Sequence, residues 1–397
     1  MKKQGIRITK KQARTIALHH QGLAGNAPFG KGKAGALESI RHLGYLQLDT
    51  LSVVARAHHH TLWTRNTSYK ESYLNELLRE KKIFEYWSHA AAVVPIEDYR
   101  FSLPRKAEFL SGRSHWFKKD KRVMQYVLDR IQSDGPLQAR DFETDRPRGS
   151  WWDWKPAKRA LEQLFHDGTL MVCERKGFQK VYDLAERVLP PGTDMHVPGK
   201  AEFAEHLVQS AIRAHGLASL NEIAYLRRGM AAEVKKAVGR AVAEQKLVPV
   251  QVENEKELYF AFPEIPAGAK KVAEKITLLS PFDNAIIQRK RINRFFQYDF
   301  MIECYLPEPK RKFGYFCLPV LFGDRFTGRF DPKADRETGV FHVKSLYIEN
   351  LPEKEDAFWK AFAGKLEEFA AFNGCTEIAL SRKVKVDQRK SLNRFLK

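Results

Sequence analysis

A glutamine and an aspartate two residues apart, Gln47 and Asp49, interrupt the apolar segment LGYLQLD. If this segment is extended, its side chains alternate between two faces, so Tyr45, Gln47 and Asp49 share one face. Leu46 and Leu48 then point into the core. A carboxylate and an amide on one open face can stabilise a developing cation and position a water molecule, because an amide both donates and accepts hydrogen bonds. The alternative is a capped turn, in which Asp49 only satisfies backbone donors.

The net charge indicates what such a pair could act on. Sixty-eight Lys and Arg oppose 48 Asp and Glu in 397 residues, which gives a net charge of +20. So basic a surface attracts a polyanion, with nucleic acid as the first candidate and an anionic membrane as the second. The charge is spread along the whole chain, which favours a long nucleic-acid footprint over a membrane helix. No apolar run approaches the roughly 20 residues that cross a bilayer, so we expect a cytoplasmic protein, associated with the nucleoid when it binds DNA.

Metal and cofactor binding are not expected. The four cysteines are widely spaced without a CxxC pair, and we expect reduced thiols. His58, His59 and His60 are consecutive, and neighbouring side chains on a helix point in different directions, so three in a row rarely bind one ion. We expect one or two of them to face DNA phosphates or to brace Asp49, and another to lie in the core. His89 is a further candidate for the rim of the site, with a hydrogen-bonded, half-buried histidine as the alternative.

A pattern of helices followed by a hairpin organises the chain. Residues 121–133 have apolar positions spaced near 3.6, and residues 155–168 form a second such segment with Pro156 in its first turn. Residues 169–184 then read as two strands around a basic turn at Lys176. With a short helix between the first two segments, this order is typical of a winged helix, a helix-turn-helix variant.

The same order returns at residues 201–262. A first copy is expected before both, with helices at 8–23 and 33–44 and the Gln47-Leu48-Asp49 triplet at a helix-to-strand junction. After this junction we expect a helix and a short aromatic segment. From about residue 275 the chain becomes a series of short β-rich runs, with one more helix and a basic tail.

We therefore predict an α+β protein of three tandem winged-helix units and a small C-terminal β-barrel-like domain. The predicted boundaries are 1–118 for the unit that carries the triplet, 119–195 and 196–272 for the next two units, and 273–397 for the last domain.

Several motifs resemble one family of proteins. Residues 43–65, LGYLQLDTLSVVARAHHHTLWTR, resemble the signature of the AlkZ/YcaQ-like bacterial winged-helix DNA glycosylases that unhook interstrand crosslinks. The likeness extends to EYWSHAAAVVP at 85–95, LLSPFDNAIIQRKR at 278–291 and FGYFCLPVLFGDRFTGRFDPKADR at 313–336, in order along nearly the whole chain. It implies tandem winged helices and a small β-domain that clasp DNA.

The resemblance also implies a chemistry. Gln47-Leu48-Asp49 matches the family's Gln–aliphatic–Asp catalytic motif, in which Asp49 would stabilise the sugar cation or activate water and Gln47 would position that water. The branch linked to self-resistance against DNA-alkylating natural products has Gln at the second polar position, so Asp49 indicates the crosslink-unhooking branch. The expected substrate is double-stranded DNA with N7-alkylguanine lesions or interstrand crosslinks, bound by a monomer. An N-alkylated purine is cationic and leaves without a general acid, and the triplet contains no lysine, which favours monofunctional hydrolysis.

Basic side chains are expected to hold the DNA backbone, since phosphate contacts supply most sequence-independent affinity. The candidates are Lys176 and Lys180 on the predicted wing, and Arg289, Lys290, Arg291 and Arg294 between predicted β-runs. A solvated face is the alternative for any one of them. The alternative function is a non-catalytic winged-helix transcriptional regulator. Such regulators are usually two-fold dimers with one recognition helix per subunit, which several winged helices in one chain do not favour.

Overall fold

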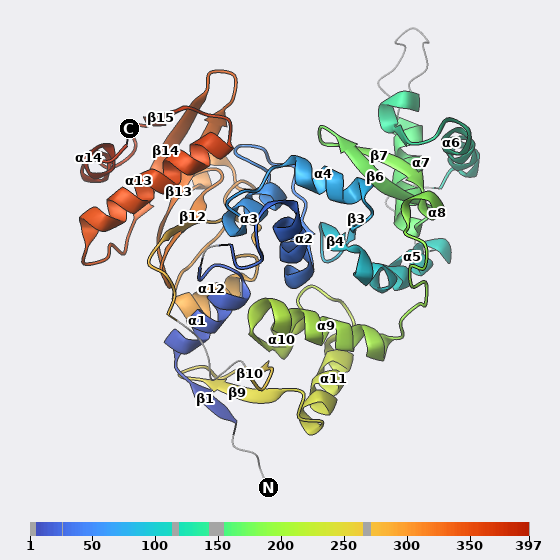
Figure 1. Cartoon of the computed structure of the whole chain (residues 1–397), viewed down its shortest axis with the longest axis horizontal. Helices are drawn as coiled ribbons and strands as arrows, with labels where there is room; N and C mark the ends of the chain where they lie inside the picture. Colours follow the sequence, from blue (N-terminus) through green and yellow to red (C-terminus); the bar gives the residue numbers. More distant parts are fainter. Residues whose placement is uncertain (1–4, 26, 113–118, 143–154, 265–270, 397) are drawn as a thin grey trace.

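The computed structural model describes residues 5–25, 27–112, 119–142, 155–264 and 271–396. A first unit lies between a C-terminal sheet domain and a second unit, and a third unit packs below it (Figure 1). Within these ranges, no helix is long and apolar enough to span a membrane.

The first unit has the order helix, strand, two helices and a two-stranded hairpin. Its sheet is antiparallel, in the order β2-β4-β3. Its elements are α2 (Gly32–Leu43), β2 (Leu46–Gln47), α3 (Ala57–Arg65), α4 (Ser72–Arg79), β3 (Ile83–Trp87) and β4 (Ala91–Pro95). Helix α2 ends at Gly44, whose φ of 79° is left-handed and turns the chain sharply into β2. The helix that we predicted after the triplet is α4, whereas the residues that follow it form the hairpin at 83–95, because their apolar side chains alternate between two buried faces.

The second and third units repeat this order. The second has a sheet in the order β5-β7-β6, and the third has β9, β10 and β8 in the order β9-β10-β8. The second comprises α6 (Lys121–Asp134), β5 (Leu137–Gln138), η2 (Ala139–Phe142), α7 (Lys155–Asp167), β6 (Leu170–Lys176), β7 (Gln179–Leu184) and α8 (Ala185–Val188). The third comprises α9 (Lys200–His215), β8 (Leu217–Ser219), α10 (Leu220–Ile223), α11 (Ala231–Ala243), β9 (Val248–Val252) and β10 (Leu258–Ala261).

The N-terminal strand and helix pack against the third unit and α12. Strand β1 (Ile6–Ile8) pairs in parallel with β9 of the third unit. Helix α1 (Lys10–His20) begins with a capping box between Thr9 and Gln12 and packs against α9 and α12. After the first unit, η1 (Ile96–Ser102) and α5 (Leu103–Leu110) lead towards the second. Strand β1 and helix α1, which lie within the range 1–118 predicted for the first unit, therefore pack with the third unit.

The C-terminal domain is built on one open sheet rather than the predicted barrel. Its described strands run in the order β11-β12-β13-β14-β15, with β11 and β15 as the two edges. Helix α13 covers the sheet with Phe358, Phe362, Leu366 and Phe369, all fully buried. The elements are β11 (Ile276–Leu278), α12 (Arg289–Phe296), η4 (Glu308–Lys310), β12 (Leu318–Phe322), β13 (Arg325–Asp335), β14 (Val340–Ile348), α13 (Glu355–Phe372), β15 (Glu377–Leu380) and α14 (Val386–Asn393).

Two buried ion pairs join the C-terminal part to the units around it. Arg65 of α3 forms a bidentate pair with Asp283, at 2.7 and 2.8 Å, and both side chains are fully buried. Arg291 of α12 binds Glu222 of the third unit at 2.6 Å. Removing one partner of such a pair leaves an uncompensated buried charge, so these pairs fix the first and third units against the C-terminal domain.

Candidate active site

The triplet lies at the end of an edge strand. Gln47 is the last residue of β2 and is opposite Ala92 of β4, and the backbone N–H of Leu48 continues the pairing by donating to the carbonyl of Ala91 at 2.8 Å. Leu46 is fully buried, and Leu48 packs partly buried against the same core. The predicted alternation is therefore confirmed at the two leucines. Gln47 and Asp49 are half-buried.

His89 orients Gln47. It lies in the turn of the β3–β4 hairpin, and its Nε2 is 3.2 Å from Oε1 of Gln47. Burial, followed by the charge of Arg227, lowers the pKa of His89 to about 4, so its ring is neutral at physiological pH. An amide oxygen only accepts hydrogen bonds, so the proton of this neutral ring is on Nε2 and is donated to Gln47. The amide nitrogen of Gln47 is left to donate elsewhere.

Other parts of the chain hold His89 in turn. The ring of Tyr45 meets it edge-on with centroids 4.9 Å apart, and the ring of Tyr225 does so at 5.9 Å. Arg227 of the third unit donates to the carbonyl of Ser88 at 2.9 Å and to its hydroxyl at 2.6 Å. The hairpin turn is thus fixed by a residue about 140 positions away. No local pattern around Ser88 or Arg227 predicts this contact.

Asp49 caps a turn with one carboxylate oxygen and leaves the other oxygen free. Its Oδ1 accepts from the backbone N–H of Leu51 at 2.8 Å, which is the capped turn. Its Oδ2 accepts no hydrogen bond from any described residue. Burial raises the pKa of Asp49, and the bond from Leu51 offsets this only in part. A half-buried carboxylate with one free oxygen is suited to stabilise a cation or to accept a proton from water.

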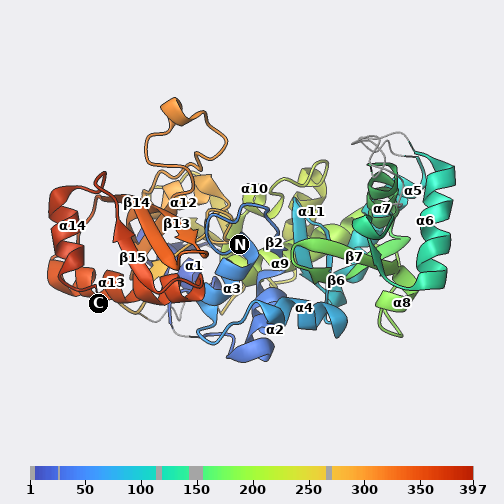
Figure 2. The same ribbon diagram turned by 90° about the horizontal axis from the view of Figure 1, so that it is seen from above.

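A segment that the sequence did not connect with the site comes close to Asp49. Burial, and after it the charge of Asp49, raises the pKa values of Cys304 and Tyr305. Both residues belong to the segment between α12 and β12, part of which projects as a loop in Figure 2, while its ends, at Tyr298 and Phe316, are buried. We predicted a strand here, but residues 297–307 form none. The buried carboxylate of Glu303 accepts three backbone N–H groups at 312–314 instead and closes the loop, leaving Tyr305 72% exposed.

The SPFDN sequence supports the strand that carries the triplet. The side-chain amide of Asn284 donates to the carbonyl of Tyr45 at 3.0 Å, next to the fully buried Arg65–Asp283 pair. Asn284 is itself buried. Only the family resemblance pointed to this motif, and the structure places it directly behind β2.

The three consecutive histidines lie in α3, away from hydrogen-bonding contact with Asp49. His58 is buried, His59 is 2.7 Å from the hydroxyl of Tyr69, and Nε2 of His60 is 2.9 Å from the carbonyl of Leu278. Burial lowers the pKa of each of them. The prediction of a core role therefore fits His58 and His60. Among the described residues, no group of three or more His, Cys, Asp or Glu could hold a metal ion.

Three of the four predicted phosphate-binding residues around α12 have partners within the protein. Arg291 is buried and paired with Glu222, so its prediction as a DNA contact is wrong. Arg289 is half-buried and donates to two backbone carbonyls, and Arg294 pairs with Glu257. Lys290 is the exposed member of the set. A run of consecutive basic residues suggests a solvent-exposed surface, but when the run forms a helix, some of its side chains face the interior of the protein.

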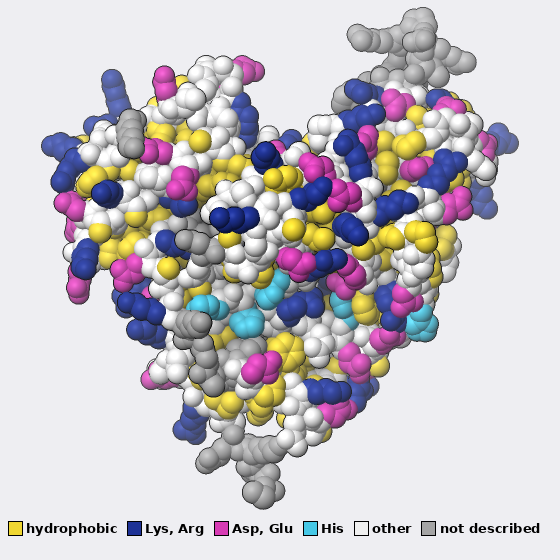
Figure 3. Space-filling view, viewed as in Figure 1, with side chains coloured by type: hydrophobic (Ala, Val, Ile, Leu, Met, Phe, Trp, Pro, Cys, Tyr) yellow, Lys and Arg dark blue, Asp and Glu magenta, His cyan; other side chains and the backbone are white. Residues whose placement is uncertain are grey.

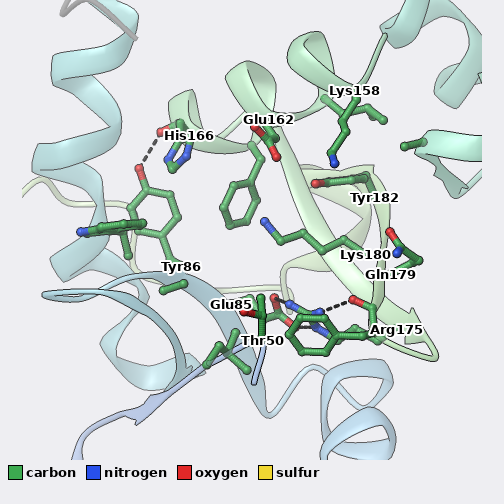
Figure 4. Close-up of a pocket in the computed structure, with 17 residues that line it drawn as sticks. Thr50, Glu85, Tyr86, Lys158, Glu162, His166, Arg175, Gln179, Lys180 and Tyr182 are labelled. Carbon is green, nitrogen blue, oxygen red and sulfur yellow. Dashed lines mark hydrogen bonds and ion pairs between the residues drawn. The ribbon is translucent and has the colours of Figure 1, made fainter. Parts of the chain in front are cut away.

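The hairpin of the second unit folds back onto the first unit. Arg175 pairs with the buried Glu85, and Phe178 at the hairpin tip lies under Arg56, whose guanidinium is 4.2 Å from the ring centroid. Lys176 is exposed, but Lys180 is half-buried and points into a cavity beside the triplet (Figure 4). Elsewhere, lysines and arginines are spread over the visible face rather than gathered in one patch (Figure 3).

One family of known proteins matches most of this chain. The model of the family described as "DNA glycosylase AlkZ-like" matches residues 40–372. The chain belongs to this family of DNA glycosylases. Its fold is similar to that of the Streptomyces sahachiroi DNA glycosylase AlkZ, with a TM-score of 0.62 and 16% sequence identity over 96% of this chain and 100% of that one. The predicted family and enzyme class are confirmed, and the alternative of a non-catalytic regulator does not fit them.

Proposed function

We propose that this glycosylase hydrolyses the N-glycosidic bond of N7-alkylguanine in duplex DNA and unhooks interstrand crosslinks that contain this linkage. One observation carries the proposal: a carboxylate with one free oxygen, on Asp49, lies two residues from an amide that His89 holds by its oxygen. These are the two groups that hydrolysis of an already cationic base requires. The chain's net charge of +20 suits a polyanionic substrate.

The chemistry follows from the charge of the lesion. Alkylation at N7 makes the purine cationic, so the base leaves without being protonated and the sugar becomes oxocarbenium-like. Asp49 stabilises this cation, as one of the two carboxylates does in glycoside hydrolysis. Its raised pKa also makes it a better acceptor for a proton of the attacking water.

Gln47 positions the water in this scheme. Because its oxygen accepts from His89, its NH₂ group donates to the oxygen of the water, while the free oxygen of Asp49 accepts a proton of the same water. The water thus presents a lone pair to C1′ of the sugar. The bond breaks between C1′ and N9 of the guanine, the hydroxyl of the water joins C1′, and its proton passes to Asp49.

The surroundings of the triplet support a duplex substrate. We propose that the three units act as winged helices and that the exposed Lys290 contacts a phosphate. Exposed apolar side chains such as Tyr305 and Met301, which are 72% and 58% exposed, can contact a base pair that is partly unstacked at the lesion. The half-buried triplet on an edge strand is reachable by a lesion too bulky for an enclosed base pocket.

The test is excision from a duplex with a single N7-methylguanine, compared between the wild type and Asp49→Asn. We expect the variant to lose excision by at least about 100-fold, and to keep its affinity for the same duplex, because Asn retains the size of Asp and removes a negative charge that repels DNA. A duplex with an N7-linked interstrand crosslink measures unhooking in the same samples. Equal excision by the variant would contradict the role of Asp49, and excision without unhooking would restrict the proposal to monoadducts.

A further inference from the structure

The turn between α10 and α11 of the third unit packs against the proposed active site. Tyr225, in this turn, places its ring 5.9 Å from that of His89, and Nε2 of His89 is 3.2 Å from Oε1 of Gln47. Arg227, two residues later, donates to the carbonyl and to the hydroxyl of Ser88. Two residues of the turn are therefore fixed to the hairpin turn that orients Gln47.

Leu226 lies between these two anchored residues and points away from the protein. Its side chain is 62% exposed, whereas Tyr225 and Arg227 are half-buried. Because consecutive Cα atoms are about 3.8 Å apart, this exposed apolar side chain begins at the rim of the site. In Figure 2, α10 lies on the same side of the molecule as the projecting loop that carries Tyr305, which interacts electrostatically with Asp49. Leu226 is therefore on the side from which DNA reaches the triplet.

The backbone of Leu226 has a conformation that leucine disfavours. Its φ is 55°, in the left-handed region, where Cβ crowds the following carbonyl oxygen. Such a turn between two helices often contains glycine, and glycine would adopt this φ without strain. Among the described non-glycine residues with positive φ, Leu226 is the one with a branched apolar side chain. The others are Ala27, Lys81, Gln245, Asn254 and Gln297. A strained, exposed leucine beside an active site indicates a role in function rather than in folding.

We propose that Leu226 is a positioning residue that inserts into the base stack next to the lesion and brings C1′ of the damaged nucleotide to Gln47 and Asp49. Apolar side chains, leucine among them, unstack base steps in this way. The step is needed because Asp49 is half-buried, whereas stacking holds C1′ of an undistorted nucleotide inside the duplex. The inference rests on the proposed catalytic role of the triplet.

The first test compares single-turnover excision of N7-methylguanine by the wild type, Leu226→Gly and Leu226→Asn. Glycine and asparagine both tolerate positive φ, so both variants should unfold at the same urea concentration as the wild type or at a higher one. Their excision from a matched duplex should nevertheless fall on the order of tenfold. Leu110→Asn is the matched control, because Leu110 is 64% exposed at the end of α5; it should excise like the wild type.

A lesion that is unpaired beforehand separates insertion from other defects. When N7-methylguanine lies opposite an abasic-site analogue, the damaged nucleotide is displaced from the stack more easily. On this duplex Leu226→Gly should excise within about twofold of the wild type. A residue that only maintained the shape of the site would cause the same loss on both duplexes.

Unstacking is measured without base release in the Asp49→Asn background. The duplex carries 2-aminopurine next to N7-methylguanine, and 2-aminopurine becomes more fluorescent when its stacking is disrupted. Saturating Asp49→Asn should raise this fluorescence, and the protein that combines Asp49→Asn with Leu226→Gly should lose most of the rise.

Three outcomes overturn the inference. It fails if Leu226→Gly excises like the wild type from the matched duplex, if its loss is equal on both duplexes, or if the fluorescence rise survives the substitution. Lower stability of both Leu226 variants would instead assign the residue to folding. If the wild type excises no N7-methylguanine, the proposed function fails, and the fluorescence comparison still decides whether Leu226 unstacks DNA.

Discussion

The hydrogen bond from His89 to Gln47 can be tested by removing the donor and keeping the ring. His89→Phe retains an aromatic side chain against Tyr45, whose ring is 4.9 Å away, but it has no N–H for Oε1 of Gln47. A partly buried hydrogen bond of this kind contributes about 1 kcal/mol net. If the bond acts by orienting the amide, the rate of excision should fall about fivefold, since about 1.4 kcal/mol corresponds to tenfold.

The assay is single-turnover release of N7-methylguanine, read as alkali-labile abasic sites. A double-mutant cycle with Gln47→Ala separates orientation from general loosening of the site. If His89 acts through Gln47, adding His89→Phe to Gln47→Ala should cost nothing further. Tyr225→Phe is the control, because it keeps the ring beside His89 and loses only a bond to the carbonyl of Ile287. A full fivefold loss in the Gln47→Ala background would refute the reasoning.

The remaining predictions concern DNA contact and stability. Arg291→Ala should destabilise the protein by about 3–5 kcal/mol, because it leaves the buried Glu222 unpaired; urea unfolding measures this, and a change below 1 kcal/mol would show that the pair is not buried in solution. Lys290→Ala should leave stability unchanged and reduce the log–log salt slope of DNA binding by about 0.9; an unaltered slope would mean that Lys290 contacts no phosphate. Burial lowers the pKa of His60 to about 4 in the folded state, from a value near 6.5 in the unfolded chain. Above pH 6.5 the ring is neutral in both states, so the folded protein keeps its full stability there. About 3 kcal/mol of this stability should be lost as the pH falls from 6.5 to about 4, and His60→Asn should lose less on acidification in the same urea titrations.

The sequence was most informative where one local rule decided the structure. The alternation of LGYLQLD predicts two buried leucines and one polar face. Leu46 is fully buried, as predicted, and Tyr45 and Gln47 both contact His89, so they share one face. The repeated order of helices and hairpin was also visible, because each turn has its own signal, as at Gly44. At these positions the spacing of apolar residues, the glycine at the turn and the helix caps all predict the same structure.

The sequence-based predictions were wrong where packing between residues far apart in the chain determines the structure. The aromatic run FFQYDFMIECYL has strand-like composition, yet Tyr298 and Phe300 pack beneath Arg329, and Glu303 closes the rest as a loop. Pairing of β1 with β9 joins residues about 240 positions apart, which no local pattern encodes. A buried arginine such as Arg291 differs from its exposed neighbour only by the direction in which the helix presents it.

The active site itself depends on such long-range packing. Gln47 is oriented by the hairpin turn of its own unit, and the turn is held by Arg227 of the third unit. Asp49 interacts electrostatically with Tyr305 of the C-terminal domain. The two proposed catalytic residues can be read from seven letters, whereas their geometry depends on three parts of the chain that pack together. The buried Arg65–Asp283 pair supplies this docking beside the triplet, so a variant that breaks it should impair base excision before it impairs the folding of any single unit.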